Sequence, residues 1–159
     1  MGGMTRIPPP FTPRKFPSCF VERNVIRNDS EGKGSFGAPR GDRDHQGIDL
    51  LVPPGEAVFA AFPCTFLRHV DNVYPNPKND CQRGLRGIVL QGQEHWSEIQ
   101  VKIFYAIMSI GYGEMVIGAG QFIAIAQDVA ACYRGTGMLN HIHVEMRVRD
   151  RIIDFTDAL

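Results

Sequence analysis

The sequence has 159 residues, a length that suits one domain built around one hydrophobic core. Its 17 basic and 17 acidic residues cancel, so no broad electrostatic footprint favours nucleic acid or an anionic membrane surface. No apolar run is long enough to cross a bilayer. We therefore expect no nucleic-acid binding and no membrane insertion, and a partner recognised at a local site.

The start of the chain differs in composition from the rest. Residues 1–18 are rich in proline and basic side chains, and they lack apolar periodicity. This composition predicts a flexible proline-rich arm, followed by a single folded domain over residues 19–159. The arm also lacks the apolar stretch of a secretory signal peptide.

Short β-type runs dominate the remainder. The run at 48–52 ends at a Pro-Pro-Gly turn, and later runs are separated by Gly, Pro, Asn and Asp. These later runs cover residues 57–62, 64–70, 85–91, 99–107, 121–126 and 141–148. We interpret 32–44 and 71–83 as loops. The pattern predicts a mostly β protein, a single domain built on an antiparallel β-sheet.

Cysteine spacing leaves the redox state open. The four cysteines are Cys19, Cys64, Cys81 and Cys132, and none forms a Cys-x-x-Cys pair typical of zinc knuckles or redox dithiols. Two disulfides in any of three connectivities are compatible with this count, and so are four free thiols.

The first motif with metal-binding residue types is His45-Gln46-Gly47-Ile48-Asp49. On a straight strand, His45 and Asp49 would lie about 13 Å apart, too far to share one ion. The chain must therefore bend between them, and we expect Gly47 to supply the backbone freedom for the bend.

The second motif is the alternating segment His141-Ile142-His143-Val144-Glu145. On a strand, this alternation places both imidazoles and the carboxylate on one face and the apolar residues on the other. Two imidazoles and one carboxylate form a reasonable ligand set for Zn²⁺, with a fourth position open to water. We expect Glu145 to support the site rather than to act as a base.

Both motifs carry a resemblance to a known family. Residues 45–62 (HQGIDLLVPPGEAVFAAF) and the HIHVE segment resemble the zinc metallopeptidases of the lysostaphin type, whose signatures are His-x-x-x-Asp and His-x-His. Residues 24–40, 101–105 and 153–159 are similar to one branch of that fold family, the leukocyte cell-derived chemotaxins, which are secreted signalling proteins.

The resemblance implies a fold, a cofactor and a site. The fold is the lysostaphin-type, duplicated-hybrid-motif-like β domain, and the cofactor is a zinc ion held by His45, Asp49 and His143. His141 takes the place of the family's catalytic histidine. Phe104 and Tyr105 lie in a short β run, and we expect both to be core residues.

Two departures from the family pattern bear on activity and location. Active peptidases carry a further histidine in a Tyr-x-His pattern, whereas here Tyr105 and Ala106 are followed by Ile107, which cannot transfer a proton. The chemotaxin branch shares this loss and acts as a ligand. Only Cys19 remains of that branch's six half-cystines, which weakens the inference of secretion.

Two functions follow as expectations. The first is a zinc-binding, non-catalytic, secreted signalling ligand that engages a cell-surface receptor. The second is a zinc metallopeptidase that cleaves glycine-rich or peptidoglycan peptide bonds with the assistance of His141. Ile107 favours the first.

Overall fold

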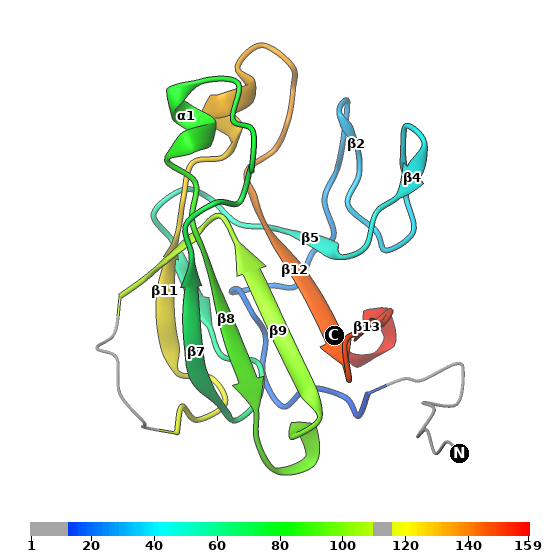
Figure 1. Ribbon diagram of the computed structural model, residues 1–159, viewed down its shortest axis with the longest axis vertical. Coiled ribbons are helices and arrows are strands. Elements are labelled where there is room, and N and C mark those ends of the chain that lie inside the picture. Colours follow the sequence, from blue (N-terminus) through cyan, green and yellow to red (C-terminus); the bar gives the residue numbers. More distant parts are fainter. Residues whose placement is uncertain (1–12, 110–115) are drawn as a thin grey trace.

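The computed structural model describes residues 13–109 and 116–159 (Figure 1). Its regular structure consists mainly of short antiparallel strands, together with one helical turn and three 3₁₀ turns. The strands are β1 Asn28–Asp29, β2 Gly32–Lys33, β3 Pro39–Arg40, β4 Arg43–Asp44, β5 Ile48–Leu51, β6 Ala57–Phe59, β7 Cys64–Val70, β8 Gly87–Gly92, β9 Ile99–Phe104, β10 Ala106–Met108, β11 Phe122–Ala126, β12 His141–Val148 and β13 Arg151–Ile152. The helical segments are α1 Asp80–Arg83, η1 Glu94–Trp96, η2 Ala130–Tyr133 and η3 Thr156–Ala158.

The larger sheet is six-stranded and antiparallel. Four of its strands follow the order β12-β9-β8-β7, β13 flanks β12, and β5 also pairs with β12. The smaller sheet has the order β10-β11-β6. Two short hairpins, β1-β2 and β3-β4, stand beside the β5 end of the larger sheet (Figure 1).

One hydrophobic core joins the two sheets. Residues of alternate positions on β12, such as Ile142 and Val144, are fully buried and pack with Ile103 of β9, Val58 of β6 and Ala124 of β11. The intervening positions of β12 face the other way, which leaves one face of this strand available for polar side chains. The predicted fold class, mostly β with antiparallel sheets, is confirmed.

Two segments expected to be loops contain regular structure. Residues 32–44 hold β2 and the β3-β4 hairpin, which pair only over two residues each. The segment 71–83 ends in α1, whose first turn is capped by the Asn79 side chain. Such short elements have no apolar periodicity, so the sequence pattern does not reveal them.

One residue of the expected arm, Phe16, contacts the core. The side chain of Phe16 is buried against Phe62 and Phe155, and the Phe16 amide donates to the Ala158 carbonyl. Phe16 therefore anchors this part of the expected arm on the core, and residues 1–12 lie outside the described part of the chain. The reason is that a single aromatic side chain carries enough apolar area to anchor a segment without periodicity.

A disulfide joins Cys81 of α1 to Cys132 of η2, and Cys19 and Cys64 are free thiols. Within the described residues, no helix has the length and apolar character needed to traverse a membrane.

Candidate metal centre

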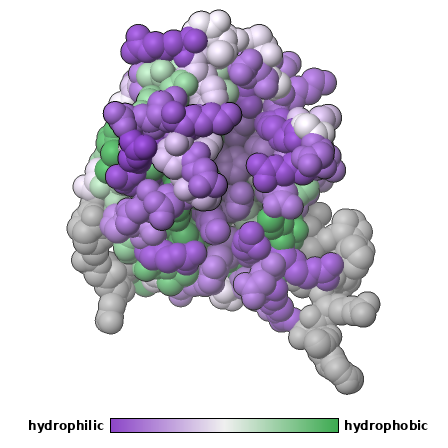
Figure 2. Space-filling model, turned by 45° about the horizontal axis from the view of Figure 1, so that its top comes forward, coloured by the Kyte–Doolittle hydropathy of each residue, from purple (hydrophilic) through white to green (hydrophobic). Residues whose placement is uncertain are grey.

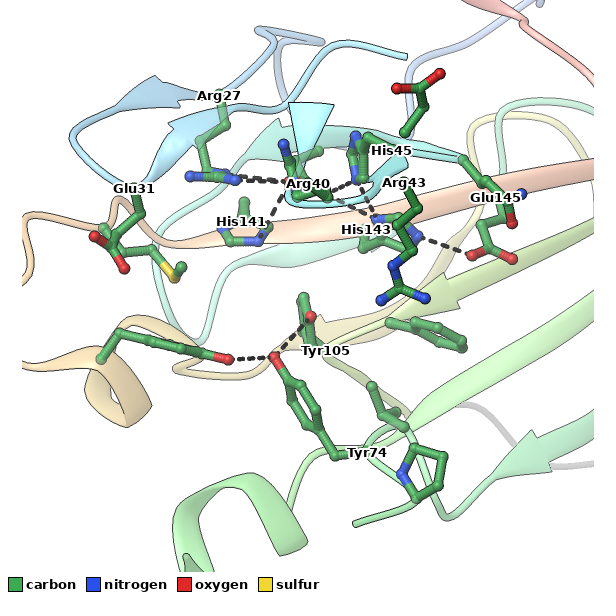
Figure 3. Close-up of a pocket in the computed structure, with 18 residues that line it drawn as sticks. Arg27, Glu31, Arg40, Arg43, His45, Tyr74, Tyr105, His141, His143 and Glu145 are labelled. Carbon is green, nitrogen blue, oxygen red and sulfur yellow. Dashed lines mark hydrogen bonds and ion pairs between the residues drawn. The ribbon is translucent and has the colours of Figure 1, made fainter. Parts of the chain in front are cut away.

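Strand pairing brings the two motifs together. β5 runs antiparallel to β12 in a register that sets Asp49 opposite His143. His45 precedes β5, and its Nε2 atom lies 3.1 Å from Nδ1 of His143 and 3.3 Å from Oδ1 of Asp49. The same Asp49 oxygen lies 2.8 Å from Nδ1 of His143. The three predicted ligands therefore converge at one point. Figure 3 shows His45 and His143 pointing toward each other.

Gly47 permits this convergence by its size rather than by its backbone freedom. Its φ angle is not positive, in contrast to the expectation from the sequence. A Cβ atom at this position would lie 2.5 Å from the Val144 carbonyl oxygen and 2.7 Å from Cε1 of His143. The bend between His45 and Asp49 thus passes so close to the imidazole that only glycine fits.

In His45 and His143, one imidazole nitrogen points away from the point of convergence and makes a hydrogen bond there. These outer hydrogen bonds determine which nitrogen of each ring faces the centre. Nδ1 of His45 lies 3.0 Å from the Ser35 carbonyl oxygen, and Nε2 of His143 lies 3.1 Å from Oε1 of Glu145. Because a carbonyl and a carboxylate only accept, these outer nitrogens carry the hydrogen. In the neutral imidazoles the inner nitrogens therefore present lone pairs, and Glu145 supports the site as expected.

Three acceptors this close together fit a bound cation. In a tetrahedral zinc site with ligand bonds of about 2.0 Å, the ligand atoms are about 3.3 Å apart. The separations of 2.8, 3.1 and 3.3 Å come near this value. His45, Asp49 and His143 thus form a possible metal-binding group, whose nitrogen and carboxylate atoms suit zinc.

The second oxygen of Asp49 is held by arginine. Oδ2 accepts from Nη2 of Arg27 at 3.1 Å, and Arg27, which is 3% exposed, also contacts Asp29 at 2.8 Å. Burial alone would raise the pKa of Asp49, but hydrogen bonds with His143 and His45 outweigh it and hold the pKa well below its usual range. The carboxylate is therefore ionised and oriented before any ligand arrives.

The metal-free centre has a strong affinity for a proton. Burial disfavours the charged form of His143, but hydrogen bonds to Asp49 and Glu145 outweigh it and raise the pKa to about 9. A cation and a proton therefore compete for the same position.

His141 lies beside the metal group without being part of it. Its Nδ1 donates to the Leu139 carbonyl at 2.8 Å, which leaves Nε2 with a lone pair 3.8 Å from Oδ2 of Asp49. Burial lowers the pKa of His141, and this effect exceeds the opposing attraction of Asp49. The imidazole is thus neutral at neutral pH and able to accept a proton.

The metal group opens onto a pocket of about 560 Å³. Figure 2 shows this side of the molecule hollowed and largely hydrophilic. Phe104, opposite His143 in the register of β9 and β12, stacks on the His143 ring at a centroid distance of 5.5 Å. Tyr105 has a positive φ of 70°, and its ring meets that of His141 edge to face at 5.4 Å. The two aromatic residues therefore line the pocket, and the expectation that they are core residues was wrong.

Sequence reasoning also missed Tyr74 and Tyr133, which line the same pocket. They are 59 residues apart, yet their hydroxyl oxygens lie 2.6 Å from each other. No motif connects these positions, and the only sequence signal was that Tyr133 directly follows Cys132. Ile107 lies on β10 opposite Ile125, is 51% exposed and does not line the pocket.

Solved structures of peptidases share the fold of this chain. No family model matches the sequence. A zinc-containing peptidase from Vibrio cholerae superposes with a TM-score of 0.58 at 20% identity over 89% of this chain, which spans 39% of that longer protein. The catalytic domain of lysostaphin from Staphylococcus simulans superposes with a TM-score of 0.53 at 15% identity, covering 82% of this chain and 88% of that domain.

The fold is therefore that of the lysostaphin-type (M23) peptidases. Among curated sequences, leukocyte cell-derived chemotaxin-2 of Mus musculus is 34% identical over 123 residues, which cover 77% of this chain and 73% of that protein. The chain belongs to the leukocyte cell-derived chemotaxin-2 family.

The close approach at Gly47 leads to a testable expectation. In Gly47→Ala, the added methyl group would displace His143, so we expect weaker zinc binding and a loss of about 1–3 kcal/mol of unfolding free energy. Urea unfolding and zinc titration measure both effects. Gly118→Ala is the control, because nothing lies within 4 Å of the added Cβ there. Equal zinc affinity and stability of the two variants would contradict the packing argument.

Proposed function

We propose that this protein is a zinc-binding, non-catalytic signalling ligand that acts outside the cell on a cell-surface receptor. One observation carries the proposal. Among the described residues that line the pocket, His141 is the only imidazole outside the metal group. The position that corresponds to the family's second proton-transferring histidine is Ile107, whose exposed side chain lies away from the pocket.

The proposed role of the metal follows from where its ligands lie. His45 belongs to the segment that enters β5, whereas His143 lies on β12, so a zinc ion bound by both would cross-link the β3-β4 hairpin region to the sheet. Arg27 and Glu145 hold the ligands in place from outside. Such a centre stabilises one surface shape, which suits recognition by a receptor.

The disulfide supports an extracellular location. The half-cystines Cys81 and Cys132 differ from those of the chemotaxin branch, yet cross-links of this kind form and persist in oxidising compartments. The cell-surface receptor is the part of the proposal that follows from the resemblance to secreted signalling proteins.

The second candidate is a zinc peptidase for glycine-rich or peptidoglycan peptides. The orientation of His141 favours it, because Nε2 faces the pocket with a lone pair. A bound zinc would supply Lewis-acid polarisation of a carbonyl, and His141 would accept a proton. His141 would then have to act without a second imidazole.

A cleavage assay separates the two functions. We expect the zinc-loaded protein to release product from pentaglycine and peptidoglycan-type peptides far more slowly than about 1 s⁻¹, because a positioned acid or base typically contributes about 10²–10⁴ in rate. Ile107→His is the matched variant that restores the residue type. Turnover near 1 s⁻¹ by the parent, abolished in Asp49→Ala, would establish the peptidase instead.

A further inference from the structure

The wall of the pocket that faces the histidines is built from tyrosine hydroxyls. The Tyr133 and Tyr74 oxygens lie 2.6 Å apart. The Tyr74 and Tyr105 oxygens lie 3.3 Å apart (Figure 3). We call this row, Tyr133-Tyr74-Tyr105, the tyrosine ladder. None of its members belongs to the metal group, and the proposed ligand function does not use them.

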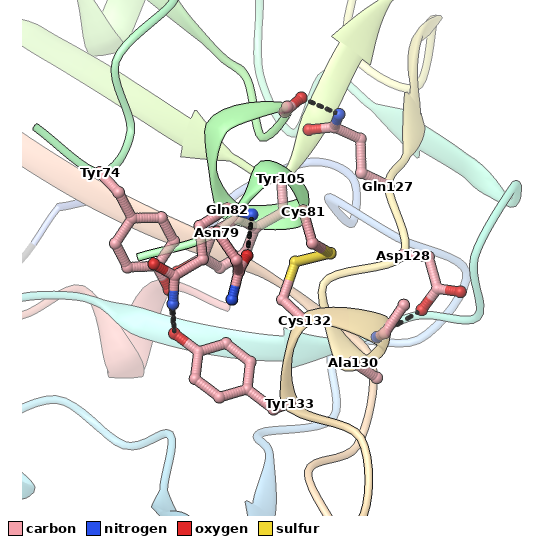
Figure 4. Close-up of a disulfide and its surroundings, with 12 residues drawn as sticks. Tyr74, Asn79, Cys81, Gln82, Tyr105, Gln127, Asp128, Ala130, Cys132 and Tyr133 are labelled. Carbon is pink, nitrogen blue, oxygen red and sulfur yellow. Dashed lines mark hydrogen bonds between the residues drawn. A yellow bond between two sulfur atoms is a disulfide. The ribbon is translucent and has the colours of Figure 1, made fainter. Parts of the chain in front are cut away.

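The hydrogen bonds of Gln82 determine which group is the donor at the Tyr133 end of the ladder. The backbone amide of Lys78 donates to Oε1 of Gln82 at 2.8 Å, and a backbone amide can only donate. The other terminal atom of Gln82 is therefore its NH₂ group. This group lies 3.4 Å from the Tyr133 oxygen and donates to it (Figure 4).

The direction of the remaining protons follows from this donor. If each phenol oxygen accepts one hydrogen and donates one, Tyr133 donates to Tyr74, and Tyr74 donates to Tyr105. The hydroxyl proton of Tyr105 then has no acceptor among the described residues and remains available to the pocket. Burial raises the pKa of Tyr105 to about 12, so the hydroxyl stays protonated at neutral pH.

The disulfide cross-links the two segments that carry Gln82 and Tyr133. Cys81 directly precedes Gln82, and Cys132 directly precedes Tyr133. The cross-link therefore holds the amide donor of α1 against the hydroxyl acceptor of η2 (Figure 4). Without it, two segments of only four residues each would carry this hydrogen bond.

We propose that Gln82, held by the Cys81–Cys132 disulfide, orients the tyrosine ladder so that Tyr105 donates a hydrogen bond to a carbonyl oxygen of a peptide bound in the metal pocket. The Tyr105 ring contacts that of His141, so this donor lies beside the metal group. Both the donor and a zinc ion favour an oxygen ligand. The proposal rests on the metal pocket of the proposed function and names the class of ligand it takes.

Calorimetric titration with N-acetyl-tetraglycine amide tests the proposal, since this probe offers carbonyl oxygens but no carboxylate or side chain. In the zinc-loaded protein, Tyr105→Phe should weaken binding about fivefold, as expected for the loss of one neutral hydrogen bond. Gln82→Glu keeps the shape and the Lys78 contact but accepts from Tyr133. The ladder then reverses, and binding should weaken to a similar extent.

The double variant Gln82→Glu/Tyr105→Phe decides whether Gln82 acts through the ladder. Binding to it should match that of Tyr105→Phe alone, because a reversed ladder has no donor left to lose. An additional loss would mean that the new charge acts directly, and it would overturn the proposal. Unchanged binding in Tyr105→Phe, or no binding to the parent, would overturn it as well.

A second pair of variants tests whether the Cys81–Cys132 disulfide positions Gln82 against Tyr133. Cys81→Ser/Cys132→Ser should weaken the probe severalfold at unchanged zinc content, whereas Cys19→Ser, which removes an exposed free thiol, should leave binding as in the parent. Equal binding of both would contradict a positioning role for the disulfide. Zinc content and peptide cleavage are measured in each sample. Absent zinc or rapid cleavage would contradict the proposed function. Unchanged peptide binding in the variants would contradict the role of the ladder.

Discussion

Replacing Asp49 with alanine is expected to abolish stoichiometric zinc binding and to destabilise the domain by about 3 kcal/mol. The carboxylate is one of the three groups that converge in the possible metal-binding group, and it is also a partner of the buried Arg27. Its removal leaves the guanidinium, 3% exposed, with Asp29 as its remaining close carboxylate. Breaking a buried ion pair on one side is costly because the other charge stays desolvated.

Elemental analysis of protein purified without chelator measures the zinc, and urea unfolding measures the stability. Asp42→Ala is the matched control, because this aspartate is exposed in the same segment. The variant Asp49→Asn separates the effect of charge from that of volume, since it removes the charge and retains the volume. A parent without zinc, or an Asp49→Ala protein that keeps zinc and unfolds at the same urea concentration, would show that the site assignment is wrong.

Zinc affinity is expected to fall steeply with acidity, by about a hundredfold between pH 8 and pH 6. The pKa of His143 in the metal-free centre is about 9, so below this pH each zinc ion must displace one proton. The apparent dissociation constant then rises about tenfold for each unit that the pH falls. Competition titrations with a chelator at several pH values measure this slope.

The stability of the metal-free protein should depend on pH in the opposite sense. The pKa of His143 is raised above its ordinary value of 6.5, so protonation stabilises the metal-free fold. This stabilisation is complete below about pH 6.5 and is lost as the pH rises through 9. Glu145→Gln removes one of the two carboxylates that raise this pKa and should shift both dependences to lower pH. Zinc affinity that stays constant between pH 6 and pH 8 would contradict the competition.

The local pattern of the sequence was sufficient for the class of fold and for the three residues that converge in the possible metal-binding group. Alternation along residues 141–148 depends only on the period of a strand, so it correctly predicted that His143 and Glu145 share a face. The His-x-x-x-Asp spacing likewise indicated a bend between His45 and Asp49. The physical cause of that bend was missed, because the bulk that Gly47 avoids belongs to residues about 100 positions away in the chain.

What the sequence by itself determined is therefore the set of strands, their polar and apolar faces, and the residue types of the metal group. The tertiary structure alone decided the rest: the packing of Phe16 on the core, the pairing of Cys81 with Cys132, and the tyrosine ladder opposite the histidines. Faces and spacings follow from backbone geometry within a few residues, which any window of sequence contains. Contacts between loops depend instead on how the two sheets close over one core, and no local pattern encodes that closure.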